Sequence, residues 1–312
     1  MQAQELTARF AELYIGSLEE LESRGATAAA SGDVDARPVT SCLDLVRLRE
    51  KALRDAGFTD IFRPIKRLEN EKALELLPEV CEEIDGIADP RQRWEAVVRG
   101  VFAGNIFDLG CTTTTEMYHE NGMSFHDTRE KLVSRPWVID CLDEMLDRVT
   151  THTYNKAVLF VDNAGADVIL GMLPLARELL KRGTTVVVAA NELPSINDMT
   201  AAELEALLPQ ICSSDALLCK AVSSQRLRVV SSGSGLPVID LSQVSHELAD
   251  ACVDADLVIL EGMGRSIETN LNARFSVDSL KLGMIKHQEV ASALGGRIYD
   301  CVCKFDRGGG VA

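Results

Sequence analysis

The run AVLFV at Ala157–Val161, followed directly by the tetrapeptide DNAG at 162–165, decides the fold of this chain. Five consecutive apolar residues indicate a strand that is buried on both faces. An amphipathic helix is predicted next, over 168–182, with Gly183 at its end, and TTVVVAA at 184–190 predicts a second strand. A buried strand, a helix and another buried strand form a parallel unit, so this stretch predicts an α/β protein.

The same alternation continues toward the C-terminus. Three further runs predict strands, at 227–231 (LRVVS), 256–260 (DLVIL) and 298–303, with helices between them. Continuous apolar strands that alternate with helices are typical of a parallel sheet covered on both faces. We therefore expect residues 151–312 to form one sheet domain.

Residues 1–150 show a different pattern, with apolar residues at helical spacing and no convincing strand alternation. Helices are predicted in five stretches, at 6–21, 41–57, 73–84, 90–101 and 138–149. Gly57 stands where a helix commonly ends, and Asp89-Pro90 is a typical helix start because proline fits the first helical position. We therefore expect a helical N-terminal region, 1–150, ahead of the sheet domain.

The composition excludes several classes of partner. The chain has 312 residues and a net charge of −16, and a surface this acidic repels nucleic acid and anionic lipid. No apolar run approaches the roughly 20 residues of a membrane span. The N-terminus lacks the features of a signal peptide, and nine irregularly spaced cysteines are typical of buried thiols in a reducing compartment. We expect a cytoplasmic protein, in which an anionic substrate would need a cation or focused basic groups at its site.

Polar residues follow three of the predicted strands at the point where each strand ends. Asp162 and Asn163 follow the first strand, Asn191 follows the second, and Glu261 follows the run at 256–260. The carboxyl ends of parallel strands lie at one edge of a sheet, and ligands bind at that edge. Asp198, in the loop after the second strand, can reach the same edge.

Asp162, Asn163 and Asp198 together suggest a metal site. Two carboxylates and a carboxamide supply hard oxygen ligands, and the carboxylates would repel each other in the absence of a cation. Oxygen-only ligands favour Mg²⁺ or Mn²⁺, although the geometry could admit Co²⁺ or Ni²⁺. The alternative is structural, with Asp162 as an ordinary strand-end residue and Asp198 as a helix cap.

The run Glu261-Gly262-Met263-Gly264-Arg265 is a candidate for binding an anion, and so is Lys286. Glycines let backbone N–H groups approach an anion closely, and Arg265 can form a forked pair with a phosphate. The alternative is a tight turn with solvated basic side chains. Asn105 and Asp108 follow the helix predicted at 90–101, where they could either face the same edge or cap the helix.

These motifs resemble those of the damage-control metal phosphatases. The resemblance rests on DNAG at 162–165, on Asn191 with Asp198, on EGMGR at 261–265, on Met284-Ile285-Lys286, and on Asn105 with Asp108. It covers nearly the whole chain. The EGMGR run points to the eukaryotic subfamily that includes the C-terminal phosphatase module of the fourth-type pantothenate kinase and stand-alone plant relatives.

The resemblance implies both a fold and a site. The fold is an N-terminal all-helical region followed by a three-layer αβα Rossmann-like sandwich. The metal, Mn²⁺, Co²⁺ or Ni²⁺ with Mg²⁺ also compatible, would be held by Asp162, Asn163 and Asp198. Phosphate contacts would come from Asn191, the EGMGR run at 261–265 and Lys286, and the catalytic residues would be Asp162, Asp198 and Lys286.

The function implied is hydrolysis of small phosphorylated metabolites, with 4′-phosphopantetheine or its oxidised or sulfonated forms as substrates in coenzyme A-related damage control. The attacking group would be either a water or a carboxylate such as Asp162. The alternatives are a phosphosugar phosphatase of the same family and a non-catalytic module that binds a phosphometabolite. Methyl transfer is a third class, but DNAG at 162–165 is a poor glycine-rich loop for it. A homo-oligomer is compatible with the sequence.

Overall fold

A computed structural model describes residues 42–106, 125, 128–129 and 132–309 of the chain. The chain divides into two compact units, residues 1–61 and 62–312. In the first unit the structure describes helix α2 (Cys42–Asp55), which confirms the helix predicted after residue 41. Gly57, at φ +85°, follows this helix as expected. The helix predicted over 6–21 lies outside the described residues.

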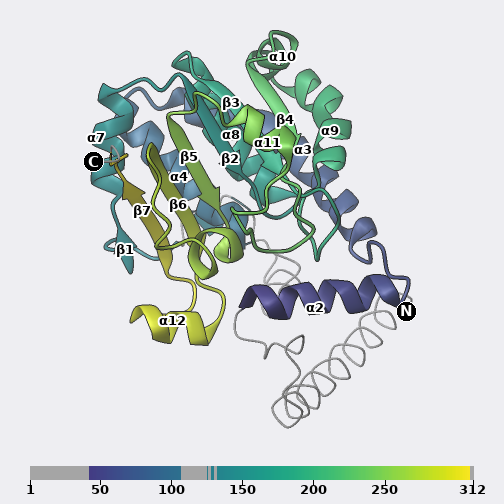
Figure 1. The fold of residues 1–312 in the computed structure, drawn as a ribbon. Helices are drawn as coiled ribbons and strands as arrows, with labels where there is room; N and C mark the ends of the chain where they lie inside the picture. The colour runs from purple at the N-terminus through teal and green to yellow at the C-terminus, as the bar shows by residue number, and fades with distance from the viewer. Residues whose placement is uncertain (1–41, 107–124, 126–127, 130–131, 310–312) are drawn as a thin grey trace. The chain divides into compact units, whose positions relative to one another are not determined.

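The described residues of the second unit form a seven-stranded sheet, with the order β1-β7-β6-β5-β2-β3-β4 (Figure 1). The strands are β1 (Ile139–Asp140), β2 (Lys156–Phe160), β3 (Thr185–Ala190), β4 (Leu227–Ser231), β5 (Leu257–Glu261), β6 (Asp278–Met284) and β7 (Cys301–Asp306). The central pairs β5–β2, β2–β3 and β3–β4 are all parallel. The strands predicted at the centre of the sheet are therefore confirmed.

One side of the sheet differs from the prediction. Strand β6 was not predicted, because Lys281 interrupts its apolar run, yet this side chain is fully buried and its Nζ donates to Asp306 at 2.8 Å. Strand β7 starts three residues later than predicted and is antiparallel to β6. The prediction that all strands are parallel is therefore wrong on this side of the sheet. In addition, the two-residue strand β1 lies within residues 1–150, where no strand was predicted.

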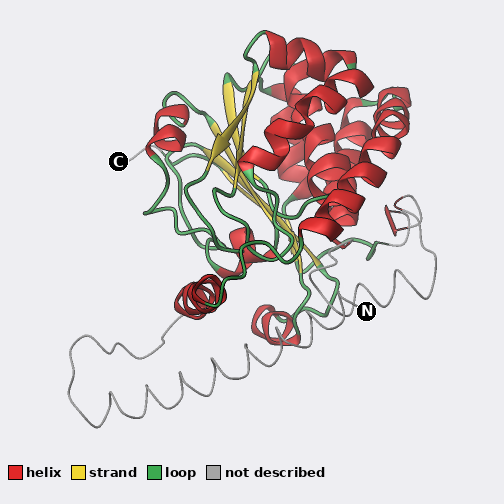
Figure 2. Ribbon diagram, turned by 90° about the vertical axis from the view of Figure 1, so that its right-hand side faces the viewer, coloured by secondary structure: helices red, strands yellow, loops and turns green. Residues whose placement is uncertain are grey.

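Most helices of the second unit cover one face of the sheet, as Figure 2 shows with the sheet seen edge-on. They are α3 (Arg63–Gly86), α4 (Pro90–Ile106), α7 (Leu142–Thr151), the π-helix η1 (Asp167–Met172), α8 (Leu173–Lys181), α9 (Ala201–Ser214) and α10 (Ala216–Ser223). Leu159, Val188 and Ile259 are neighbours in the sheet, and they share one core with these helices.

The opposite face carries a smaller layer. Val158, Val187 and Val258 point to this side, because side chains alternate along a strand, and they pack with Leu248 of α11 (His246–Ala251). The π-helix η2 (Met263–Glu268) and α12 (Gln288–Leu294) share a further apolar cluster. Two helical layers enclose the sheet, which confirms the predicted three-layer αβα sandwich.

Helices α3 and α4 belong to the same compact unit as the sheet. Helix α4 packs against η1, and Gly104 permits this approach, since a Cβ there would lie 2.8 Å from the Cα of Asp167. The domain division at residue 150 stays a prediction. In the described part of the chain, no helix is both long enough and apolar enough to cross a membrane.

Candidate metal and phosphate site

The candidate site lies where the order of strands reverses. From β2 the chain proceeds outward through β3 and β4, and it then returns to place β5 on the other side of β2. Such a switch point leaves a crevice at the carboxyl ends of the two strands. The Asp162 backbone N–H, just after β2, donates to Glu261 Oε2 at the end of β5, over 3.0 Å. The predicted meeting of strand ends is confirmed for this pair.

The three predicted metal ligands lie side by side. Asn163 and Asp198 form an isolated antiparallel bridge, and the Met199 N–H donates to the carbonyl of Asp162 at 2.9 Å. The loop after β3 therefore runs against the segment after β2. Asp162, Asn163 and Asp198 are 6%, 1% and 0% exposed, so all three side chains lie in an interior environment.

Arg265 connects the two carboxylates. Its guanidinium donates to Asp162, to Asp198 at 2.8 Å and to Asn191 at 3.0 Å. The neighbouring Asp198 and Asp162 carboxylates raise the pKa of Arg265 despite its burial. Asn191 also donates to Asp198, at 3.0 Å. The roles of Arg265 and Asn191 as phosphate contacts stay predictions, because these interactions join them to other protein groups.

A second group of buried polar residues lies behind Asp162. Asp167 Oδ2 accepts from the side-chain amides of Asn105 and Asn163, each at 2.9 Å. Asn105 also donates to Glu261 Oε1 at 3.0 Å. Sequence reasoning missed Asp167, because an acidic residue at the start of a helix has an ordinary structural explanation. The signal available was its position five residues after Asp162.

Helix α3 also contributes residues that the sequence did not single out. The Asn70 side-chain oxygen accepts from the Gly165 N–H at 2.7 Å. Lys66 is fully buried and forms an ion pair with Glu203 at 2.7 Å, and its Nζ lies 3.4 Å from the carbonyl oxygen of Asp198. Both loops of the site are therefore supported by the helical region.

Crowding of carboxylates gives this site its electrostatic character. Carboxylate oxygens of Asp162, Asp167 and Glu261 lie within 4.8 Å of one another. Burial raises the pKa of all three carboxyl groups; Asp198 and Asp167 raise the pKa of Asp162 further, and Asp167 does the same for Glu261. Arg265 acts in the opposite direction on Asp162. A bound cation would relieve the remaining repulsion.

The residues present fit a hard divalent cation. Asn163 Oδ1 and Asp167 Oδ1 are buried and have no hydrogen-bond partner among the described residues. Buried polar atoms normally have a partner, so two such atoms at one place indicate a missing cation or water. Asp162 belongs both to the predicted set with Asn163 and Asp198 and to the carboxylate cluster with Asp167 and Glu261.

The remaining predicted residues lie around this centre, with one exception. Lys286 follows β6, is 9% exposed, and lowers the pKa of Asp162 and Asp167 through its charge. Its backbone N–H lies 3.3 Å from the sulfur of Met263. Met263 and Gly264 are not in an open loop but in the first turn of η2. Asp108 lies outside the described residues.

Gly262 provides a test of the close packing around Asp162. It has φ +94°, and a Cβ there would overlap the Asp162 carboxylate. We expect Gly262→Ala to lower turnover at least ~100-fold and to destabilise the fold by about 2–4 kcal/mol, because backbone strain and overlap add. Steady-state kinetics and urea unfolding measure the two effects.

Gly183 is the matched control. It has nearly the same φ, +97°, but nothing lies within 4 Å of the position that a Cβ would take there. Gly183→Ala should therefore cost only the backbone strain, about 1 kcal/mol, and leave turnover unchanged. Equal effects of the two substitutions would show that contact with Asp162 is unimportant.

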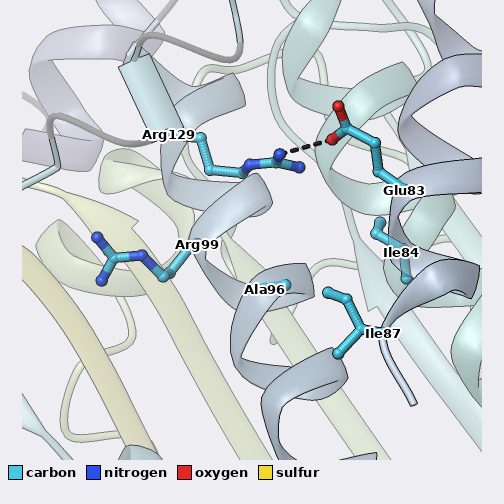
Figure 3. A pocket seen from close by; sticks show the side chains of 6 residues that line it. All are labelled: Glu83, Ile84, Ile87, Ala96, Arg99 and Arg129. Atoms are coloured by element: carbon cyan, nitrogen blue, oxygen red, sulfur yellow. Dashed lines mark hydrogen bonds and ion pairs between the residues drawn. The ribbon is translucent and has the colours of Figure 1, made fainter. Parts of the chain in front are cut away.

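A separate cavity of about 250 Å³ is lined by residues from the C-terminal end of α3 and the middle of α4 (Figure 3). It is lined by Glu83, Ile84, Ile87, Ala96, Arg99 and Arg129. Arg129 forms an ion pair with Glu83 at 2.6 Å, whereas Figure 3 shows Arg99 extending away from this pair. The cavity shares no residue with the site at the strand ends.

Known proteins provide an independent comparison. The sequence profile of the damage-control phosphatase ARMT1-like domain matches residues 2–302. A damage-control phosphatase of Arabidopsis thaliana is 53% identical over 302 residues, covering 96% of this chain and 79% of that protein. The 4′-phosphopantetheine phosphatase of Mus musculus is 30% identical over 356 residues, covering 98% of this chain and 42% of the mouse protein.

The chain also resembles part of a larger plant protein and one solved structure. Pantothenate kinase 2 of Arabidopsis thaliana is 44% identical over 297 residues, covering 84% of this chain and 32% of that protein. A DUF89 family protein from Pyrococcus horikoshii superposes with a TM-score of 0.58 at 20% identity, covering 96% of this chain and 94% of the other, and shows the fold alone. Because the family profile spans nearly all of the sequence, this chain belongs to the damage-control phosphatase ARMT1-like domain family.

Proposed function

We propose that this phosphatase uses a divalent metal to hydrolyse phosphomonoesters of small metabolites, and that 4′-phosphopantetheine or its oxidised or sulfonated forms are its substrates. The observation that carries the proposal is the buried meeting of Asp162, Asn163 and Asp198 from two separate loops. The substrate is supported by the mouse relative, which is named a 4′-phosphopantetheine phosphatase and aligns with 98% of this chain.

Each part of the site has a proposed task. Asp162, Asn163 and Asp198 would hold Mn²⁺, Co²⁺ or Ni²⁺, and Mg²⁺ is compatible with the same oxygen donors. When bound, the cation supplies positive charge that offsets the charge of a phosphate ester. Lys286, the Gly262–Gly264 backbone, Asn105 and Asp108 would complete the surroundings of the phosphate.

Arg265 has two proposed tasks in this scheme. Its guanidinium is fixed by Asp162, Asp198 and Asn191, which supports a role as a rigid donor to the phosphate group. A rigid, preorganised donor stabilises charge that develops during phosphoryl transfer. The same guanidinium also neutralises the two carboxylates that face it.

The wider setting is also a proposal. The described cysteines are all free thiols, which supports a reducing compartment such as the cytoplasm. A homo-oligomer stays a prediction from the sequence.

Hydrolysis of p-nitrophenyl phosphate tests the reaction class. We expect activity with Mn²⁺ or Co²⁺ and none with EDTA, and 4′-phosphopantetheine should then be cleaved with a higher kcat/KM than phosphosugars. Equal rates of hydrolysis in EDTA and in Mn²⁺ or Co²⁺ would show that the reaction does not require a metal. Binding of a phosphometabolite without phosphate release would identify a non-catalytic module instead, and a preference for phosphosugars would overturn the proposed substrate.

The raised carboxyl pKa values predict how pH and metal act together. In the folded protein the pKa values of Asp162, Asp167 and Glu261 lie above the ordinary 3.8 for Asp and 4.5 for Glu. The protonated site therefore favours folding at low pH, and this contribution is lost as the pH rises through the raised values. A cation held by Asp162 favours the ionised form of Asp162 and, through its charge, that of the neighbouring Asp167 and Glu261, so its stabilising effect should grow over the same range.

Thermal unfolding measures this linkage. We expect the gain in Tm from Mn²⁺ over EDTA to be larger at about pH 7.5 than at about pH 5. A gain that is the same at both pH values would mean that metal and protons do not compete for these groups.

A further inference from the structure

We propose that Asp167 is a positioning residue that fixes the side-chain amide of Asn163 with its oxygen turned toward the metal. The inference rests on the proposed function, because it assumes that a cation binds beside Asp162 and Asn163. It concerns a residue that the sequence did not single out.

The orientation of the Asn163 amide follows from its neighbours. Its Nδ2 donates to Asp167 Oδ2 at 2.9 Å and lies 3.2 Å from Asp162 Oδ2. In the metal-bound protein these carboxyl groups are ionised, and an ionised carboxylate only accepts hydrogen bonds. If the amide were turned over, its oxygen would face two carboxylate oxygens, and the resulting repulsion and loss of hydrogen bonds exclude that arrangement.

The orientation has a consequence for the metal. With Nδ2 directed at the carboxylates, Asn163 Oδ1 is the atom left without a hydrogen-bond partner in the described part of the chain. Only the oxygen of a carboxamide can coordinate a cation, because its NH₂ group is a donor. The hydrogen bond to Asp167 therefore keeps the correct atom of Asn163 available.

Asp167 is itself held in place from several sides. Its Oδ2 also accepts from the Asn105 amide at 2.9 Å and from the Asn163 backbone N–H at 3.3 Å. Asn105 in turn accepts from the Met284 N–H at 3.3 Å, which fixes which end of the Asn105 amide faces Asp167. A chain of hydrogen bonds thus runs from β6 through α4 to the Asn163 amide.

The competing assignment makes Asp167 a metal ligand, since one of its oxygens lies within 4.8 Å of those of Asp162 and Glu261. The geometry favours positioning through Oδ2, because three N–H groups converge on that oxygen. Oδ1 has no hydrogen-bond partner among the described residues, so it is the atom through which direct coordination of the cation would occur. Groups that orient a metal ligand in this way typically change metal affinity 10- to 100-fold when they are removed.

Two substitutions of Asp167 separate these roles. Asp167→Asn keeps an oxygen that can accept from the Asn163 amide, whereas Asp167→Ala removes it. We expect Asp167→Ala to weaken Mn²⁺ binding about 10- to 100-fold and Asp167→Asn to weaken it less than about 5-fold. The Kd is measured from the electron paramagnetic resonance signal of free Mn²⁺, with circular dichroism to verify folding. Asp167→Leu fills the volume if the alanine variant does not fold.

A double-mutant cycle adds an independent measurement. In an Asn163→Asp background the two side-chain oxygens are equivalent, so there is no amide to orient. We expect Asp167→Ala to change the Mn²⁺ Kd less than about 3-fold in that background. An undiminished effect there would mean that Asp167 acts on the metal directly and would overturn the inference.

Three other results of the Mn²⁺-binding measurements would each decide against the inference. Equal losses for Asp167→Asn and Asp167→Ala would identify Asp167 as a ligand through its charge. Unchanged Mn²⁺ binding by Asp167→Ala, with normal metal-dependent hydrolysis, would reject the inference and leave the proposed function intact. Absence of Mn²⁺ binding by the unsubstituted protein would overturn the proposed function and this inference with it.

Discussion

Asp162→Ala is expected to abolish metal-dependent phosphatase activity, with a loss of at least ~1,000-fold in turnover, or about 4 kcal/mol of transition-state stabilisation. Asp162 is common to both groups of oxygen donors and also contacts Arg265. Its removal therefore takes away a proposed metal ligand and one of the partners that hold the guanidinium. The activity is measured as phosphate release with Mn²⁺ or Co²⁺.

Stability should respond differently from activity in this variant. The lost contact with Arg265 is offset by reduced repulsion among buried carboxylates, so the metal-free protein should unfold within about 1 kcal/mol of the unsubstituted one. The gain in Tm from Mn²⁺ should disappear. Urea unfolding in EDTA and thermal unfolding with Mn²⁺ give these two quantities.

Asp215 offers the matched control for Asp162. It is also buried, at 8% exposed, and it pairs with Arg177 at 2.7 Å and caps α10. Asp215→Ala should therefore destabilise the fold by about 3 kcal/mol, but Mn²⁺ should still raise the Tm of this variant. Full activity of Asp162→Ala would refute the assignment of the site.

The sequence was sufficient to predict the centre of the sheet and part of the site. Strands β2, β3 and β5 are continuous apolar runs, and a parallel arrangement brings their carboxyl ends together. Asp162 and Glu261 follow such runs directly, so their proximity could be predicted. Asp198 could be connected to them because its loop is short.

The features that escaped prediction depend on long-range contacts. Lys281 looks like a surface residue in sequence, but its Nζ is paired with Asp306, 25 positions away, and with the Ala273 carbonyl, which allows it to be buried in β6. Asp167 looks like a residue of the first helical turn, and its role requires that α4 bring Asn105 next to it. The local sequence does not indicate which helix will pack against a given strand end.

The contacts of Arg265 also could not be predicted from the local sequence. The run EGMGR at 261–265 suggests an arginine directed at an anion, but the structure directs its guanidinium at two carboxylates. Both observations agree if Arg265 neutralises Asp162 and Asp198 and also adjoins the phosphate. This dual role leads to a prediction in which stability and metal binding change together.

Arg265→Ala should destabilise the metal-free protein by about 3–5 kcal/mol, because it leaves two buried carboxylates without their guanidinium partner. Added Mn²⁺ should recover more stability in this variant than in the unsubstituted protein, since the cation takes over the neutralisation of Asp162 and Asp198. Activity should stay at least ~100-fold low even with saturating Mn²⁺, because the preorganised donor is lost. Arg265→Lys should restore part of the stability but little of the activity, since lysine lacks the planar fork.

Arg177 supplies the control that separates these effects from general damage to a buried ion pair. It is 8% exposed and pairs with Asp85 and Asp215, each at 2.7 Å, outside the candidate site. Arg177→Ala should lower the free energy of unfolding by a similar amount. Mn²⁺ should then raise the free energy of unfolding of this variant only as much as it does for the unsubstituted protein. Urea unfolding of the three proteins in EDTA and in Mn²⁺ provides the comparison. If Mn²⁺ gave all three the same increment, the cation and the guanidinium of Arg265 would not be acting on the same carboxylates.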